Sequence, residues 1–399
     1  MANFAMVKNR LLAGSGTVLP YLLGAAFVFS YYTNLGTTII LAVSAWYIIL
    51  NWKVVLGNRW ALLVIGFFAA IAAKDGVMLI LGDGSFRAFA KSGSRVVVLL
   101  GSAALLEAYE RKRLEWAFEI ALGITFAAIG VAFIAMRASW IPWVFNSNTF
   151  GMLGVFFPLV LACRLRRKGG IHAYVAAAVV LALGFCIFLA DALDRTAGSR
   201  TAPLAYLLAA AFVLAPWKPK ALAVVAGGAV VALAVISIVV LSVVFVPKLD
   251  DLLAERQQLW QGFVQKGAER PLLGWGYTEE DDNRRLVGPL LEGKRAYEMI
   301  MRKGLGPHNA FLGMFFENGA IAALFFVTLF FLRVLRSSTP FGSFDVSLIA
   351  YIAFMSSDAM NPGGLTFLGY YLGICLLAVR PSAVNESRES DQGWHRDIS

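Results

Sequence analysis

The sequence predicts an all-α, polytopic membrane protein with about twelve transmembrane helices and one large polar loop. Hydrophobic residues make up 59% of the 399 residues and charged residues only 15%, whereas about 25% of an average soluble domain is charged. The mean hydropathy is correspondingly high, at +0.70. Apolar runs recur along the whole chain. At about 17–25 residues, each is long enough to cross a hydrocarbon core of roughly 30 Å.

The apolar runs form two groups of spans, one on each side of the polar loop. We expect spans one to nine within residues 1–246, the loop at residues 247–307, spans ten to twelve within residues 308–379 and a polar tail at residues 380–399. The first ten residues lead into an apolar run without a small-residue cleavage site, so no cleaved signal peptide is expected. The predicted spans are residues 13–32, 35–51, 60–80, 94–109, 115–136, 147–163, 171–190, 201–216, 220–246, 308–334, 343–358 and 363–379.

The distribution of Lys and Arg predicts the orientation in the membrane, because cytoplasmic loops are enriched in both. One set of connections carries eighteen basic residues and the other, apart from the long loop, only seven. Both termini and the tail are therefore expected in the cytoplasm, and the polar loop on the opposite side. The smaller set is Lys74, Arg87, Lys91, Arg95, Arg137, Arg195 and Arg200.

The remaining composition argues against several other functions. The net charge of +10 resides in short loops between spans, as topology signals do, so it does not indicate nucleic-acid binding. Cys163, Cys186 and Cys375 are scattered among apolar runs, without the paired spacing of a metal site or a disulfide framework. We interpret them as small packing residues.

Three outward connections end in a polar residue that directly precedes an apolar run. Such a residue is expected to cap a helix whose first N–H groups, with a partial charge of roughly +0.5, point outward. Helix ends of this kind suit a phosphate or pyrophosphate group at the membrane surface. The three expected caps and their basic neighbours are Ser94 with Arg95, Ser199 with Arg200, and Asn309 with His308.

The polar loop is electrically neutral, because its 61 residues include ten basic and ten acidic side chains. Its apolar residues recur at helical spacing over Leu249–Lys266, and a second helix is expected over Gly293–Lys303. Pro271–Tyr277 is interpreted as a turn with an aromatic platform of the kind that receives a sugar ring. Glu279–Asp282 is interpreted as a solvated acidic face. No histidine or second acidic cluster is spaced to complete a metal site with it.

His308 is the histidine best placed for outward chemistry. His172 lies beside a basic cytoplasmic loop and His395 in the polar tail. A histidine at a helix N-terminus has its protonated form disfavoured by the helix dipole, so its imidazole is able to accept a proton near neutral pH. Glu317 lies nine residues on, about 180° round a helix at 100° per residue. We therefore expect it on a different face from His308, in a structural role.

These residues resemble a known family. HNAFL at residues 308–312, followed by ENG at 317–319, resembles the H-N-x-x-L…E-x-G signature of the O-antigen ligase and polymerase superfamily. GSR at residues 198–200 resembles its second motif. Arg256 with Trp260, followed by Pro271, Gly274 and Gly276, resembles the start of the large periplasmic loop of this superfamily.

The resemblance implies a metal-independent, inverting glycosyltransferase of the GT-C type in the inner membrane of a bacterium, without a cofactor. The donor would be an O-antigen polysaccharide on undecaprenyl pyrophosphate, and the acceptor a sugar hydroxyl of the lipid A–core oligosaccharide. Among the residues, the resemblance gives Arg200 and Arg256 the role of pyrophosphate ligands, and His308 that of general base.

Position alone adds further candidates to this site. Arg270, Arg95 and Lys91 are candidate pyrophosphate ligands, and a supporting role is expected for Asn309, Trp260 and Trp275. Undecaprenyl pyrophosphate is already a good leaving group, so stabilising its charge and deprotonating the acceptor would suffice.

Three alternatives remain open. An O-antigen polymerase or a protein O-oligosaccharyltransferase would share the His308 motif, although polymerases commonly have two sizeable outward loops and this chain has one. A secondary transporter would also be polytopic, but it should have paired, broken helices in two matching halves.

Overall fold

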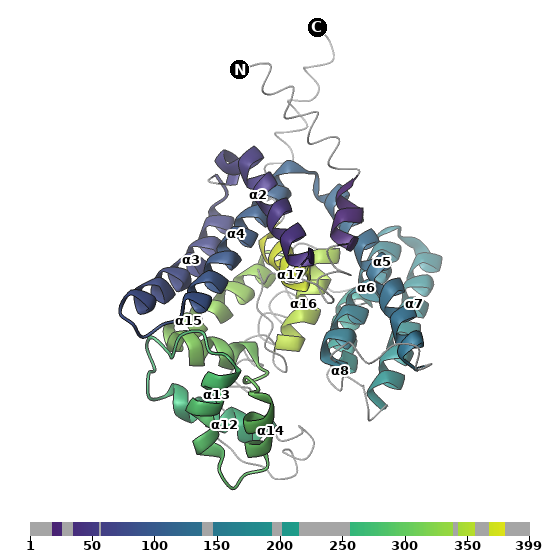
Figure 1. The fold of residues 1–399 in the computed structure, drawn as a ribbon. Coiled ribbons are helices and arrows are strands. Elements are labelled where there is room, and N and C mark those ends of the chain that lie inside the picture. Colours follow the sequence, from purple (N-terminus) through teal and green to yellow (C-terminus); the bar gives the residue numbers. More distant parts are fainter. Residues whose placement is uncertain are drawn as a thin grey trace.

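The computed structural model describes residues 18–25, 35–55, 57–137, 147–193, 202–214, 256–337, 342–355 and 367–379, and every regular element within them is helical (Figure 1). Residues 18–25 form a helix inside the first predicted span. Ten further helices match predicted spans, while the predicted span at 220–246 lies outside the described residues. These ten are α2 (Leu35–Val55), α3 (Arg59–Ile80), α4 (Phe86–Ala108), α5 (Arg111–Arg137), α6 (Ser147–Arg167), α7 (Gly170–Leu193), α8 (Ala202–Leu214), α15 (Ala310–Leu335), α16 (Ser343–Met355) and α17 (Phe367–Leu377).

Three of the described helices, α3, α4 and α15, are long and apolar enough to cross a membrane. Several shorter apolar helices accompany them, among them the segments 36–51, 170–186 and 205–214. An all-helical arrangement of this kind is consistent with the predicted polytopic membrane protein.

The prediction for the start of α4 is wrong. The helix begins at Phe86 and not at residue 94, because the side chain of Ser85 accepts a hydrogen bond from the backbone N–H of Ala88 (3.1 Å) and caps it there. Ser94 therefore lies inside the helix, where its hydroxyl donates to the carbonyl of Lys91 (2.8 Å). Arg95 is a side chain on the wall of a helix and not one at a helix end.

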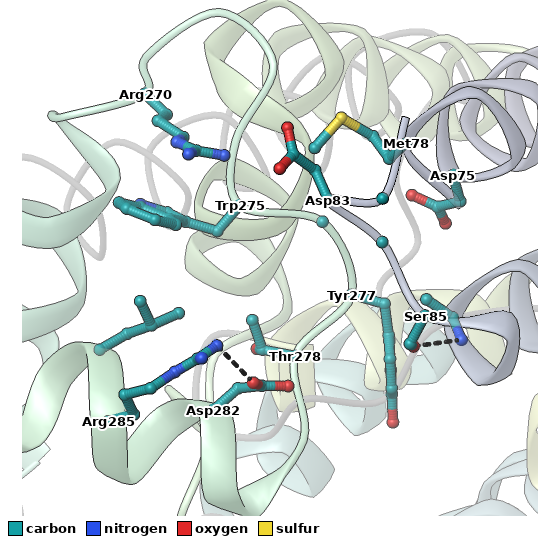
Figure 2. Close-up of a pocket in the computed structure, with 15 residues that line it drawn as sticks. Asp75, Met78, Asp83, Ser85, Arg270, Trp275, Tyr277, Thr278, Asp282 and Arg285 are labelled. Carbon is teal, nitrogen blue, oxygen red and sulfur yellow. Dashed lines mark hydrogen bonds and ion pairs between the residues drawn. The ribbon is translucent and has the colours of Figure 1, made fainter. Parts of the chain in front are cut away.

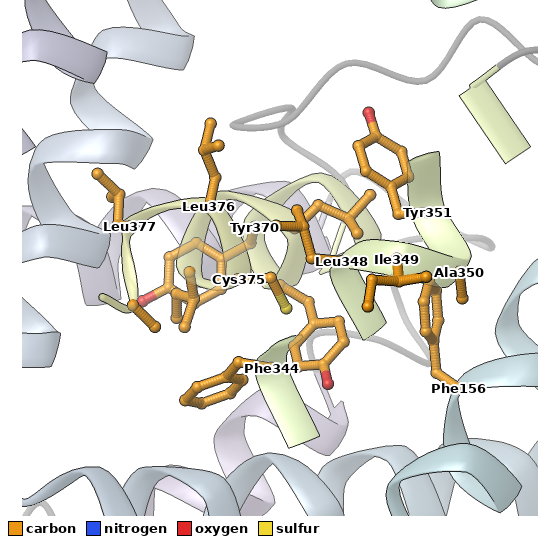
Figure 3. Packing of buried hydrophobic residues seen from close by; sticks show 14 of the residues in the cluster. Phe156, Phe344, Leu348, Ile349, Ala350, Tyr351, Tyr370, Cys375, Leu376 and Leu377 are labelled. Atoms are coloured by element: carbon orange, nitrogen blue, oxygen red, sulfur yellow. The ribbon is translucent and has the colours of Figure 1, made fainter. Parts of the chain in front are cut away.

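The C-terminal helices α16 and α17 lie in the centre of the molecule, between α2–α4 and α5–α8 (Figure 1). Tyr351, Tyr370 and Cys375 are fully buried there, and Phe156 of α6 packs against the same cluster (Figure 3). The described parts of α16 and α17 are therefore packed among neighbouring helices.

The helix ends described below group into two faces. At the first, Arg336 after α15 lies 4.5 Å from the ring centroid of Trp60 in α3. Arg167 of α6 pairs there with Glu115 of α5 (2.6 Å). We call this end the basic face. The opposite ends of α3, α4 and α15 meet the polar loop.

The polar loop folds into a small helical unit that packs on the beginning of α15. It contains α12 (Arg256–Gly267), α13 (Glu280–Val287), the 3-10 helix η2 (Gly288–Leu291) and α14 (Ala296–Lys303). Helices α12 and α14 agree with the prediction where they are described. Helix α13 was missed, because its first turn is the acidic stretch interpreted as a solvated face.

The core of this unit explains its attachment to the membrane helices. Trp260 and Phe263 of α12 are buried with Leu312 and Phe316 of α15, and the rings of Phe263 and Phe316 meet edge to face with centroids 4.8 Å apart. The first turns of α15 therefore belong to the core of the loop unit, and this contact fixes the unit over one end of the bundle.

A buried ion pair joins three helices at the basic face. Arg333 of α15 is fully buried and lies 2.8 Å from Asp345 of α16. Its guanidinium also donates to the carbonyls of Cys375 (2.9 Å) and Ala378 (2.7 Å), at the end of α17. Arg111 of α5 adds a second, longer contact to Asp345 (3.3 Å).

Replacing Arg333→Met is expected to destabilise the protein by about 3–5 kcal/mol, because it leaves a buried carboxylate without its closest cation. Denaturant unfolding in detergent micelles measures this. The double variant Arg333→Met/Asp345→Leu should recover part of the loss, since both charges are then removed. A single variant as stable as the wild type would contradict the proposed importance of the pair.

Candidate functional site

The turn before α15 holds His308 outside the helix. The carbonyl of Pro307 accepts a hydrogen bond from the indole N–H of Trp260 (2.6 Å), and Asn309 caps α15 by accepting from the backbone N–H of Leu312 (3.0 Å). Between these two anchors, His308 has a φ of +46°, in the left-handed region. A non-glycine residue there costs on the order of 1–3 kcal/mol, a strain that clusters at functional sites. Trp260 and Asn309 thus fix the backbone on both sides of His308.

Helix α15 is broken nine residues after its first residue, Ala310. Gly319 has a φ of +83° in the middle of the helix, which only glycine adopts without strain. The break frees backbone groups that a continuous helix would pair. The backbone of the loop supplies their partners. The backbone N–H of Trp275 donates to the carbonyl of Phe316 (2.9 Å), and the backbone N–H of Gly276 donates to the carbonyl of Glu317 (2.9 Å).

The loop and the break approach each other too closely for side chains. A Cβ added at Gly319 would lie 2.1 Å from the carbonyl oxygen of Leu272, and one at Gly274 would lie 2.5 Å from the backbone nitrogen of Asn318. Ala320 donates in turn to the carbonyl of Pro271 (2.7 Å). The close contact between the loop backbone and the break in α15 therefore requires glycine at both 274 and 319, two positions that match the family signature.

Lys74 of α3 provides further hydrogen bonds to the residues at the break in α15. Its ammonium donates to the carbonyl of Glu317 (2.8 Å) and to the side-chain oxygen of Asn318 (2.8 Å). Asp75, whose side chain is only 4% exposed, lies 3.4 Å from the same ammonium. A charged pair of this kind near the end of a membrane helix is costly unless it is partnered, as it is here.

A cleft of about 680 Å³ opens between α4, the loop unit and the start of α15. Four predicted or weighed residues line it together: His308, Lys91, Arg95 and Glu317. We call this the His308 cleft. Its other walls come from residues 277–284 and 304–307, with Arg87 of α4.

Cationic side chains of α4 reach across the His308 cleft to the loop. The ammonium of Lys91 contacts the hydroxyl of Tyr277 and lies 4.3 Å from the centroid of its ring. Near the surface, Arg87 pairs with Glu279 (2.7 Å). These contacts tether α4 to residues 277–279, which form one wall of the cleft.

The expectation that Glu317 faces away from His308 is wrong, because the helical count included His308, which lies before the cap. Glu317 lines the same cleft, and it also faces a small cavity with Arg95 and Tyr277. Its carboxylate accepts a hydrogen bond from the backbone of Thr278 and is attracted by Arg95 and Lys74. Glu317 therefore shares the cleft with His308 and interacts with two of the nearby cations.

A second cleft, of about 430 Å³, lies beside the first and shares Tyr277 and Thr278 with it. Figure 2 shows its arrangement: Arg270 and Trp275 form one side, and Asp83 points toward Arg270 from the turn between α3 and α4. We call it the Trp275 cleft. Arg270 thus lies in a different cleft from His308, Lys91 and Arg95.

The indole of Trp275 does not present a bare face, as the predicted aromatic platform would. The guanidinium of Arg270 lies 4.2 Å and the ammonium of Lys266 4.7 Å from its ring centroid. The indole N–H donates to the carbonyl of Lys266 (2.8 Å). Trp275 therefore holds Arg270 in place at the edge of its cleft.

Of the two pyrophosphate ligands that the resemblance predicts, only Arg256 is among the described residues. Arg200 lies outside the described residues, as does Ser199. Arg256 is the first residue of α12 and lines neither the His308 cleft nor the Trp275 cleft. Of the predicted acidic face, Glu280 and Asp281 are exposed, whereas Asp282 lines the Trp275 cleft. Within the described residues, no group of three or more His, Cys, Asp or Glu could hold a metal ion.

Sequence reasoning missed the contacts of Lys74, Asp75, Tyr277 and Gly319. A signal existed for the first two, because adjacent charges at the end of an apolar run are rare unless they are functional or paired. Tyr277 and Gly319 were noted only as part of the expected aromatic platform and of the family signature, and their contacts were missed because the partners, Lys91 and Leu272, are distant in the sequence.

The comparisons with known proteins agree with the resemblance. Residues 195–327 match the family model described as O-Antigen ligase. Neither the search of curated proteins nor the search of solved structures found a match. The matched segment contains His308, Glu317 and Gly319, while Lys91 and Arg95 lie outside it.

Gly319→Ala is expected to destabilise the protein by at least about 1–3 kcal/mol and to impair the site, because the methyl group meets a carbonyl in a backbone conformation that alanine avoids. Thermal unfolding in detergent measures the loss. Gly66→Ala is the matched control, because an added Cβ there meets nothing within 4 Å. Equal melting temperatures for the two variants would contradict the close contact at the break.

Proposed function

We propose that this chain, whose residues 195–327 match the family model described as O-Antigen ligase, is an O-antigen ligase of the bacterial inner membrane. Members of this family are glycosyltransferase-type ligases and polymerases that act on lipid-linked polysaccharides. The reaction we propose moves an O-antigen polysaccharide from undecaprenyl pyrophosphate to a sugar hydroxyl of the lipid A–core oligosaccharide.

One observation carries this proposal: an imidazole and two cations from a distant helix line the same cleft at the start of a broken membrane helix. His308 is held by anchors on both sides, and Lys91 and Arg95 of α4 line the same cleft. The N-terminus of α15 adds the partial positive charge of its helix dipole to the same place. A base beside an anion site is the pair that transfer from a pyrophosphate donor requires.

The proposed step uses His308 as the general base. Its imidazole takes the proton of the acceptor hydroxyl, and the oxygen attacks the anomeric carbon of the donor. The bond from that carbon to the pyrophosphate oxygen breaks on the opposite face, so the configuration inverts. Lys91 and Arg95 stabilise the charge on the departing pyrophosphate, in a site where charge-assisted contacts are strong. No metal enters this scheme.

The roles of Arg200 and Arg256 as further pyrophosphate ligands rest on the resemblance alone. The proposed orientation places the loop unit and both clefts in the periplasm, and the basic face with both termini in the cytoplasm. The excess of Lys and Arg at the basic face supports it.

Reconstitution in proteoliposomes tests the function. The enzyme is supplied with an undecaprenyl-pyrophosphate glycan and, in separate reactions, with lipid A–core, a second lipid-linked glycan or an acceptor protein. Extension of lipid A–core, with and without chelator, is the expected result. Extension of the second glycan would indicate a polymerase, and modification of the protein an O-oligosaccharyltransferase. Loss of activity in chelator, restored by Mg²⁺, would contradict the metal-free step.

His308→Ala is expected to lower the rate of transfer by about 10²–10⁴-fold, the usual contribution of general base catalysis, while the protein stays folded. Single-turnover transfer and size-exclusion chromatography measure the two effects. His172→Ala is the control, because His172 is exposed near the start of α7, away from both clefts. Wild-type transfer by His308→Ala would exclude the imidazole from the chemistry.

Lys91→Ala and Arg95→Ala are each expected to weaken donor use by about 10–100-fold in kcat/KM, the range of a lost hydrogen bond to a charged group. Arg113→Ala, an exposed cation at the start of α5, should leave kcat/KM unchanged. If the cation variants alter only the KM for the acceptor, they do not hold the pyrophosphate.

A further inference from the structure

Carboxylates outnumber cations in the Trp275 cleft, whereas four cations and four carboxylates line the His308 cleft. Three carboxylates, those of Asp75, Asp83 and Asp282, line the Trp275 cleft together with two guanidinium groups, those of Arg270 and Arg285. Carboxylates repel a pyrophosphate, which carries negative charge itself. The cleft is therefore better suited to a ligand without a large net charge.

The polar groups of this cleft alternate between donors and acceptors. Arginine only donates and carboxylate only accepts, whereas the hydroxyls of Ser85 and Thr278 do both. Sugar hydroxyls also both donate and accept, so several neighbouring hydroxyls on one ring can be satisfied at once. Asp83 and Arg270 point toward each other across the cleft from different elements (Figure 2), so a ligand between them would touch both.

Exposed apolar side chains flank the Trp275 cleft on the two segments that form it. The turn between α3 and α4 carries Ile80 (84% exposed), Leu81 and Phe86, and the loop carries Leu272 and Leu273. We call these five residues the apolar collar. A polar cleft bordered by exposed apolar residues at the end of membrane helices fits an amphiphile, whose lipid part contacts the collar while its head enters the cleft.

We propose that the Trp275 cleft binds the carbohydrate of the lipid-anchored acceptor, separately from the donor pyrophosphate in the His308 cleft. This inference rests on the proposed function for the identity of the two substrates. Tyr277 and Thr278 line both clefts, so an acceptor sugar seated beside Trp275 has a short path to His308.

Binding measurements test the cleft without requiring transfer. The probe is fluorescent lipid A–core, titrated without donor against the full-length protein in nanodiscs. Asp83→Ala and Arg285→Ala should weaken binding about 10-fold, the size of a lost charged hydrogen bond. Both side chains are exposed, so neither change should disturb folding. Glu292→Gln, an exposed acid on the same loop unit outside both clefts, is the control and should bind as the wild type does.

Competition identifies which glycan enters. Lipid-free core oligosaccharide should displace the probe, and lipid-free O-antigen repeat units should not. Displacement by the repeat units alone would assign the cleft to the donor glycan and overturn the proposal. So would unchanged affinity in both Asp83→Ala and Arg285→Ala.

A separate variant tests whether the apolar collar contacts the lipid part of the acceptor. Leu272→Ser/Leu273→Ser should weaken the binding of lipid A–core but not the ability of the free core oligosaccharide to compete. Equal binding of lipid A–core by this variant and the wild type would exclude the collar as the lipid contact. If the wild type binds the probe but transfers nothing, the proposed function fails while the cleft assignment stands.

Discussion

The structure of the site depends on how the broken backbone of α15 is satisfied. A break in a membrane helix leaves carbonyl and N–H groups without partners, and each unpaired group costs several kcal/mol away from water. Here the loop backbone at residues 271–276 pairs with residues 316, 317 and 320, and Lys74 adds its ammonium. The contact works only because Gly274 and Gly319 have no side chains. It fixes the loop unit, the start of α15 and the end of α3 relative to one another.

This contact also explains where the chemistry is placed. The first turns of α15 lie in the core of the loop unit, so His308 is carried by the loop and by the membrane helix at the same time. Lys91 and Arg95 come from α4, which the tethers through Tyr277 and Glu279 hold against the loop. The site is thus assembled from rigid elements, which suits a reaction that requires a base and an anion site at fixed positions.

The sequence was sufficient for those parts of the fold that local pattern determines. Hydropathy located ten helices that the structure describes, and the cap at Asn309 followed from residue type. The start of α4 was misplaced because Ser85 and Ser94 both precede apolar residues, and only the structure distinguishes the serine that caps from the one inside the helix. The break at Gly319 could not be foreseen, since a glycine inside a helix is usually tolerated and its partner, Leu272, lies 47 positions earlier in the sequence. The Trp275 cleft could not be foreseen either, because its walls come from segments that are distant in the sequence.

The division of charge between the two clefts bears on how one enzyme would hold two large, polar substrates at a membrane surface. A single cationic cleft would attract both of its substrates' anionic groups and would not distinguish donor from acceptor. In this protein carboxylates line both clefts, but four cations match four carboxylates in the His308 cleft, whereas three carboxylates outnumber two arginines in the Trp275 cleft. Since an excess of carboxylates repels an anion, a pyrophosphate is better tolerated in the first cleft and a neutral glycan better suited to the second. The wall at residues 277–278 then separates the two ligands while keeping them adjacent, and the acceptor oxygen needs only to pass that wall to meet the imidazole.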